Sequence, residues 1–160
     1  MHLPMGHIRQ HGPTCGAVAY AMIVGCSEEQ AVLECQTKLK GKNQGTETDN
    51  VVAALKKRNI PFLRVWIDND FRCMETHLKL LSFQYKTYVV GKFVSQGKRG
   101  RPSKGWHAFA IHNGDIYDSA EGESFPIEAY YFKWNKYLWI HEIIIVGIDP
   151  TKPLDKQPTV

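Results

Sequence analysis

The dipeptide Asn113-Gly114 is the sequence feature that most restricts how this chain folds. It separates two short apolar segments, "WHAFAI" and "IYDS", and a two-residue Asn-Gly connection between such segments is typical of a type I′ hairpin turn. A two-residue turn also sets the pairing register, in which His112 faces Asp115. The sequence therefore predicts an antiparallel hairpin of defined register in the second half of the chain.

Hydrophobic periodicity around this hairpin predicts an α+β fold. Three helices are expected first: from Thr14 or Cys15 to Val24, from Ser27 to about Leu39, and over "NVVAALKKR", capped by Thr48 or Asp49. Further strands are predicted in "PFLRVWI", "YKTYVVGKFV" and "YLWIHEIIIVGI", with a short amphipathic helix in "FRCMETHLKLLSF". Helices followed by an antiparallel sheet indicate the α+β class. Residues 1–148 are expected to form one domain, and the proline-containing segment 149–160 is expected to be a frayed tail.

The composition narrows the class of protein. A chain of 160 residues with a formal charge of +4 fits one mildly basic domain. The apolar runs are too short for a membrane span, and the N-terminal residues lack a secretory signal, so we expect a cytoplasmic protein with no membrane partner. The four cysteines are scattered without a C-x-x-C pair, which favours reduced thiols over a zinc ribbon. We expect neither a metal nor another cofactor.

Cys15 is the strongest candidate for a reactive residue. It follows a polar turn and opens a predicted buried helix, where unpaired N–H groups and the helix dipole favour a thiolate. Gly16 leaves room beside the sulfur, and the Gln10 amide can join the Cys15 N–H as an oxyanion donor. The alternative is that Cys15 is a small core residue, as we expect for the other three cysteines.

The hairpin register selects a base and its partner for this thiol. Faces alternate along a strand, so His107 and Asp118 share one face as diagonal neighbours. His112 and Asp115 fall on the opposite face and are interpreted as part of a solvated turn. Since the two histidines lie on opposite faces, these two histidines and two aspartates are not expected to bind a metal ion together.

These residues together resemble a known family. Gln10, then Cys15-Gly16, then Gly45-Thr46, then "WHAFAI", and finally Asp118 with Gly122 nearby resemble the papain-like leader peptidases of bacteriocin export, which remove double-glycine leaders. The resemblance implies a papain-like cysteine peptidase, with Gln10 in the oxyanion hole, Cys15 as nucleophile, His107 as base and Asp118 as its orienting partner. The chain departs from the family at Thr14 and Ser119, where an acidic or amide residue and a proline are usual.

A basic segment precedes the strand that carries His107. "GKRGRPSKG" contains Lys98, Arg99 and Arg101, and its "RGRP" is similar to an AT-hook that lies in a narrow minor groove. The alternatives are a solvated loop, a gate for substrate, or a site for an acidic partner. We include Lys98, Arg99 and Arg101 with Gly16 and Trp106 as candidate substrate-binding residues.

Three functions remain open at this point. The first is a thiol hydrolase that cleaves a peptide or isopeptide bond in a protein or peptide substrate. The second is an effector that deamidates a glutamine side chain by the same chemistry. The third is a nucleic-acid-binding module that uses the basic "RGRP" segment.

Overall fold

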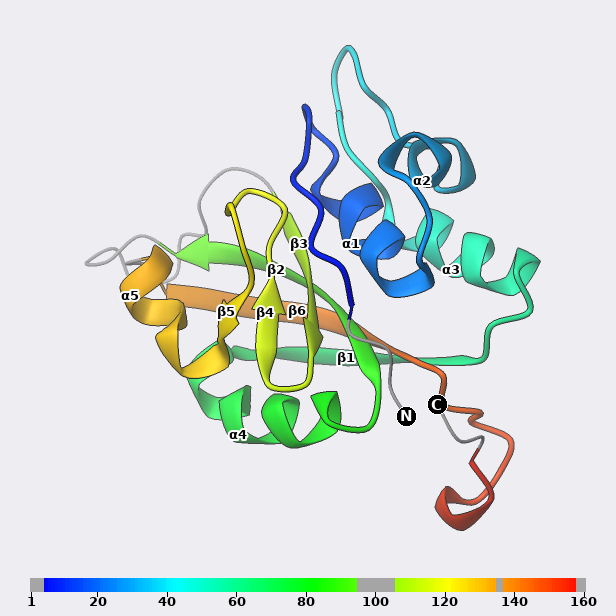
Figure 1. Ribbon diagram of the computed structural model, residues 1–160, viewed down its shortest axis with the longest axis vertical. Coiled ribbons are helices and arrows are strands. Elements are labelled where there is room, and N and C mark those ends of the chain that lie inside the picture. The colour runs from blue at the N-terminus through cyan, green and yellow to red at the C-terminus, as the bar shows by residue number, and fades with distance from the viewer. Residues whose placement is uncertain (1–4, 95–105, 135–136, 158–160) are drawn as a thin grey trace.

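The protein combines helices with one antiparallel sheet, as the computed structural model shows for residues 5–94, 106–134 and 137–157 (Figure 1). The helices are α1 (Cys15–Val24), α2 (Glu28–Glu34), α3 (Thr48–Lys57), α4 (Phe71–Ser82) and α5 (Tyr130–Trp134), with 3-10 turns η1 (Ile127–Ala129) and η2 (Leu154–Lys156). The strands are β1 (Phe62–Asp70), β2 (Lys86–Val94), β3 (His107–His112), β4 (Asp115–Tyr117), β5 (Phe125–Pro126) and β6 (Tyr137–Val146). They form a six-stranded sheet in the order β1-β6-β2-β3-β4-β5. The predicted α+β class is confirmed.

The predicted hairpin is present in the predicted register. His112 pairs with Asp115 across the turn, and Asn113 and Gly114 have φ angles of 50° and 78°, as a type I′ turn requires. The ladder between β3 and β4 ends at the pair Ala110–Tyr117. Asp118 therefore lies just beyond the strand, where the chain is free to turn its carboxylate toward the start of β3.

Helix α1 is buried on nearly every side, as its small and apolar residues predict. The residues from Gly16 to Ile23 are all buried, and the helix packs mainly on β3 and α2. It ends at Gly25, whose N–H donates to the Ala21 carbonyl and whose left-handed conformation (φ 80°) lets the Cys26 N–H donate to the same oxygen. This packing fixes the first residue of α1 against the sheet.

Two of the predicted helices differ from expectation at their ends. Ser27 caps α2 as predicted, by accepting a hydrogen bond from the Gln30 N–H, but the helix ends at Glu34 rather than near Leu39. Gln36 adopts a left-handed conformation (φ 50°), which turns the chain into a loop. The residue at the cap position of α3 is Glu47, so the prediction that Thr48 or Asp49 caps this helix is wrong.

The sheet separates two apolar clusters. One lies between the sheet and α1 to α3 and includes Tyr20, Leu55 and Tyr88; the other lies on the α4 side and includes Phe71 and Phe109. Figure 1 shows α1, α2 and α3 on one side of the sheet and α4 on the other. Successive residues of β3 therefore belong to different clusters. His107, the first residue of β3, lies on the same face of the sheet as Phe109.

The described part of the C-terminal tail is folded back on itself rather than frayed. The Gln157 side chain accepts a hydrogen bond from the Asp149 N–H (2.5 Å) and donates to the carbonyls of Asp149 and Lys152. Because one amide side chain closes this turn, the expectation of a loose tail is wrong for residues 149–157.

Candidate active site

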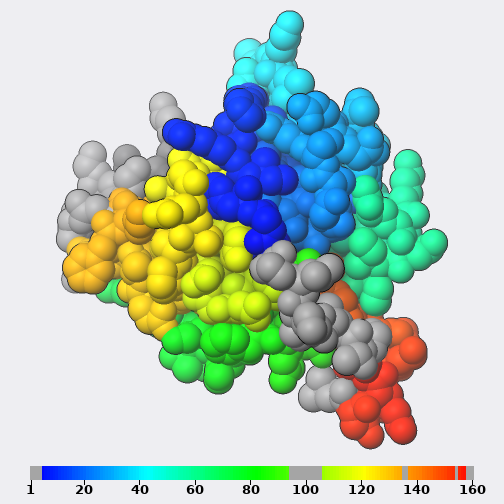
Figure 2. Space-filling view, in the orientation of Figure 1, coloured from blue at the N-terminus to red at the C-terminus, as the bar shows by residue number. Residues whose placement is uncertain are grey.

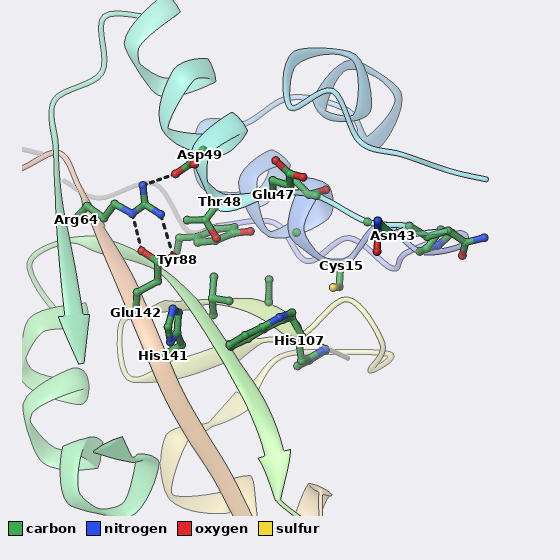
Figure 3. A pocket seen from close by; sticks show the side chains of 18 residues that line it. Cys15, Asn43, Glu47, Thr48, Asp49, Arg64, Tyr88, His107, His141 and Glu142 are labelled. Carbon is green, nitrogen blue, oxygen red and sulfur yellow. Dashed lines mark hydrogen bonds and ion pairs between the residues drawn. The ribbon is translucent and has the colours of Figure 1, made fainter. Parts of the chain in front are cut away.

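A cavity of about 730 Å³ opens beside the first turn of α1 (Figure 3). Its walls come from α1, from the loop before α3, and from strands β1, β2, β3 and β6. The lining residues are Pro13, Cys15, Gly16, Asn43, Gln44, Gly45, Thr46, Glu47, Thr48, Asp49, Arg64, Tyr88, Val90, Trp106, His107, Ala108, His141 and Glu142. Of the residues predicted to bind substrate, Gly16 and Trp106 line this cavity.

Cys15 is the first residue of α1 and is half-buried at the cavity wall. The next residue must be glycine because the chain approaches its neighbours closely there. A Cβ at Gly16 would lie 2.8 Å from both the Thr46 Cβ and the Tyr88 hydroxyl. Gly16 therefore allows the helix start, and the thiol with it, to sit deep against β2 and the loop before α3.

The Cys15 thiol is poised to ionise. Burial raises its pKa, but hydrogen bonding to His107 and the charge of that ring, together with the N–H groups of Ala108 and Gly16, lower the pKa below its usual value. By contrast, burial and the nearby Glu34 charge raise the pKa of Cys35 to about 12. The surroundings thus shift the pKa values of these two thiols in opposite directions.

His107 connects the thiol to a carboxylate. Its Nε2 donates to Asp118 Oδ2 at 2.9 Å, which leaves Nδ1 as the nitrogen available to Cys15. Burial lowers the pKa of His107, but the hydrogen bonds and charges of Asp118 and Cys15 outweigh this effect and raise it to about 9. The imidazole is therefore expected to be protonated at neutral pH, next to a thiol whose pKa is lowered. The predicted contact between His107 and Asp118 is confirmed.

Asp118 is almost completely buried and held by more than His107. It is 1% exposed, its Oδ1 accepts from the Ala120 N–H (3.0 Å), and its Oδ2 also accepts from the Trp134 indole N–H (3.1 Å). The Trp134 ring stands edge-on to the His107 ring, with centroids 6.2 Å apart. Sequence reasoning missed Trp134, because no local pattern connects the end of α5 with the hairpin.

Gln10 lies beside Ser119. Ser119 Oγ donates to Gln10 Oε1 (2.5 Å), and the two residues also share the backbone bond Gln10 N–H to Ser119 O (2.9 Å). Gln10 Nε2 donates to the Gly12 carbonyl, so one of its two amide hydrogens is committed there. In Figure 2 the N-terminal segment lies against the residues that follow β4, in agreement with these bonds. Gln10 is not among the residues that line the cavity.

The wall opposite the thiol carries a buried ion pair. Arg64 on β1 donates through Nε and Nη2 to the Glu142 carboxylate (2.6 and 3.1 Å) and through Nη1 to Asp49 (2.7 Å). Glu142 is 3% exposed, so this pairing keeps a charge in the cavity floor compensated. These three residues were not predicted, because they come from separate elements that only the fold brings together.

An aromatic row continues from the cavity along the sheet. Trp106 and His141 line the cavity with ring centroids 4.9 Å apart, and Trp66 stands edge-on to His141 at 4.8 Å. Trp106 is 53% exposed and Trp66 is 61% exposed. Large exposed aromatic side chains that adjoin a cavity are typical of a surface that contacts a ligand.

Two further predictions concern histidines and metals. His112 is buried (2% exposed), so the interpretation of the His112–Asp115 pair as a solvated turn is wrong for the histidine. Within residues 5–94, 106–134 and 137–157, no group of three His, Cys, Asp or Glu side chains is arranged to hold a metal ion. In the same part of the chain, no helix has the length and apolar character needed to cross a membrane.

The basic segment lies outside the described residues. Lys98, Arg99 and Arg101, and with them the predicted AT-hook, belong to 95–105, which the structure does not describe. The proposed gate and acidic partner therefore stay predictions.

Comparison with known proteins finds no family whose model matches this chain and no curated protein that matches it. The resemblance to the leader peptidases therefore stays a prediction from the motif residues. The function has to be argued from the site itself.

Proposed function

We propose that this protein is a papain-like thiol hydrolase that cleaves a peptide or isopeptide bond. The observation that supports this most is the line of contacts from Cys15 through His107 to Asp118 at the wall of an open cavity. The nucleophile begins a buried helix, and its base and orienting carboxylate belong to the sheet beneath it. This is the arrangement that nucleophilic catalysis by a cysteine requires.

The chemistry proceeds through an acyl-enzyme. The Cys15 thiolate attacks the substrate carbonyl carbon, and a C–S bond forms while the carbonyl electrons move to oxygen. The oxyanion accepts a hydrogen bond from the Cys15 N–H. Gln10, which is bonded to Gly12 and Ser119 and does not line the cavity, would have to turn its amide toward the oxyanion when substrate binds. The oxyanion then collapses as the protonated His107 gives its Nδ1 proton to the leaving amine, and the C–N bond breaks.

Water completes the reaction. His107, now neutral, removes a proton from a water molecule, which attacks the acyl carbon and releases the carboxylic acid and the Cys15 thiolate. Asp118 stabilises the imidazolium in both steps through its bond to Nε2. Hydrolysis of a glutamine side-chain amide would follow the same path with ammonia as leaving group.

The substrate is a protein or peptide whose chain enters an open, partly aromatic cavity. Trp106 supplies an exposed ring directly before His107 in the sequence. The four cysteines are free thiols, which suits a reducing compartment such as the cytoplasm.

Alkylation of the native protein with limiting iodoacetamide at pH 6, followed by peptide mapping, tests the activated thiol. We expect Cys15 to be labelled before the exposed Cys73, because the hydrogen bond and charge of His107 favour the Cys15 thiolate. The preference for Cys15 should disappear in His107→Ala and persist in His77→Ala, a matched change on α4. Equal labelling of Cys15 and Cys73 in the wild type would refute the proposal.

Intact mass spectrometry then separates the two amide reactions. Incubation with a mixed peptide library should produce fragments in the wild type and none in Cys15→Ala. A mass increase of about one dalton without fragments would instead identify deamidation.

A further inference from the structure

Tyr88 is a buried tyrosine that reaches the cavity and has no part in the mechanism described above. It lies on β2, is 1% exposed, and packs in the cluster beneath α1. Figure 3 shows its side chain between the Arg64 ion pairs and the helix that carries Cys15. Its hydroxyl is so close to the helix start that it would lie 2.8 Å from a Cβ at Gly16.

The Tyr88 hydroxyl has no hydrogen-bond partner in the part of the chain that the structure describes. It differs from the Thr87 hydroxyl, which is unpartnered and completely enclosed, because the Tyr88 side chain contributes to the cavity wall. A tyrosine hydroxyl that faces a cavity without a protein partner can donate to a ligand there. Such a group is retained at little loss when a ligand supplies the missing partner.

The side chains of Thr46, Val90 and Ala108, which line the cavity with Tyr88, are either already hydrogen-bonded or apolar. The Thr46 hydroxyl shares a hydrogen bond with the Thr37 hydroxyl (2.7 Å) and is therefore already engaged. Val90 and Ala108 contribute apolar wall. Burial, followed by the charges of Cys15, Cys35 and Glu142, raises the pKa of Tyr88 well above its usual value. The hydroxyl consequently keeps its proton and remains a hydrogen-bond donor.

The charges around the cavity determine which substrate groups can accept a hydrogen bond from the Tyr88 hydroxyl. Glu47, Asp49 and Glu142 all line the cavity, and Arg64 already pairs with the last two. Three carboxylates thus line the cavity against one guanidinium, so a substrate carboxylate would meet net negative charge from these side chains. An uncharged acceptor, such as a hydroxyl or a carboxamide oxygen, would not. Since Tyr88 is almost wholly buried, a side chain that projects into the cavity reaches it, whereas a main chain that passes over Cys15 does not.

We propose that Tyr88 forms the floor of a specificity subsite and donates a hydrogen bond to an uncharged acceptor on a substrate side chain. The subsite would select serine, threonine, asparagine or glutamine near the scissile bond over apolar side chains of the same shape. This inference rests on the proposed function, because the subsite is defined by its place beside the Cys15 nucleophile.

Peptidyl vinyl sulfones, which alkylate a cysteine nucleophile, test the subsite without knowledge of the natural substrate. Two series vary the first or the second residue from the electrophile, and each compares Thr with Val and Gln with Met. We expect the wild type to react about fivefold to tenfold faster with the acceptor member of each pair in one series. In Tyr88→Phe, which removes the hydroxyl alone, this ratio should fall to about one.

The ratio between paired probes cancels any general change in thiol reactivity, and the rate with iodoacetamide measures that change separately. An equal Thr-to-Val ratio in the wild type and Tyr88→Phe would overturn the subsite. So would a uniform loss of rate with all probes in Tyr88→Phe, because that result indicates a contact with the substrate backbone.

A binding measurement keeps this test separate from the proposed chemistry. Titration of Cys15→Ala with the uncleaved Thr and Val peptides should show the same preference, and it should be lost in Cys15→Ala/Tyr88→Phe. If Cys15 proves unreactive in the wild type while this binding preference is present, the hydrolase proposal fails and the subsite stands. If Cys15 reacts and neither assay shows a preference, the subsite fails and the hydrolase proposal stands.

Discussion

Replacement of Asp118 by asparagine removes one charge from the site and changes almost nothing in shape. In the protein, Oδ2 accepts from His107 and Trp134, and Oδ1 accepts from the Ala120 N–H. An asparagine can keep its oxygen toward His107 and Trp134, but its NH₂ group then faces the Ala120 N–H, donor against donor. An unsatisfied buried donor costs about 1–3 kcal/mol, and we expect this part of the loss at every pH.

A second part of the loss depends on pH, with a sign that follows from His107. Its pKa is raised to about 9 in the folded protein, against about 6.5 for an ordinary histidine. The stability that this protonation provides is complete below the unfolded value and is lost as the pH rises through about 9. At 1.36 kcal/mol per pKa unit the difference is roughly 3 kcal/mol, and Asp118 shares it with Cys15. Asp118→Asn should therefore cost about 1–2 kcal/mol more at pH 6 than at pH 10.

Urea denaturation at both pH values measures this difference in the free energy of unfolding. NMR titration of the His107 ring measures the pKa change that causes it. The ring of Asp118→Asn should lose its proton at a lower pH than that of the wild type. Asp68→Asn is the matched control, because Asp68 contacts His141 (3.1 Å) with 66% of its side chain exposed; we expect a change below about 0.5 kcal/mol there. Equal losses at pH 6 and pH 10 for Asp118→Asn, with an unmoved His107 titration, would refute the electrostatic reasoning.

Three other substitutions test packing around the site. Gly16→Ala should lower the free energy of unfolding by about 1–3 kcal/mol, because its Cβ would overlap two neighbours at 2.8 Å, and should slow alkylation of the adjacent thiol. Gly91→Ala places a Cβ 2.5 Å from a backbone carbonyl of the paired strand, so thermal denaturation should show a larger loss than for Gly122→Ala, which meets nothing within 4 Å. Trp134→Phe removes the indole bond to Asp118; we expect a loss of about 1 kcal/mol in urea denaturation, and an unchanged stability would show that this bond is replaced.

The central pair of the site could be predicted from sequence because its geometry is local. A two-residue turn and the alternation of faces along a strand suffice to place His107 beside Asp118. The start of α1 was equally accessible, since a polar turn followed by small apolar residues indicates a buried helix at Cys15. Both conclusions depend on residues separated by no more than about a dozen positions.

Other parts of the site could not be read from local patterns. The bond from Trp134 to Asp118, and the pairing of Arg64 with Glu142, join elements whose relative position depends on the sheet order. The premature end of α2 has a different cause: Gln36 takes a left-handed conformation, which few residues other than glycine adopt, and the sequence around it carries no glycine to signal the turn.

Two sets of contacts fix the position of the Cys15 thiol relative to His107. In the first set, α1 packs on β3, which carries His107. In the second set, the segment that leads into α1 is hydrogen-bonded to the turn that contains Asp118. His7 Nε2 donates to the Asp118 carbonyl, and Gln10 bonds to Ser119 through both its backbone and its side chain. The residue proposed to stabilise the oxyanion and the residue proposed to orient His107 therefore share one hydrogen-bonded junction. A shift of that turn would displace both together, because the Ser119 hydroxyl ties the two segments.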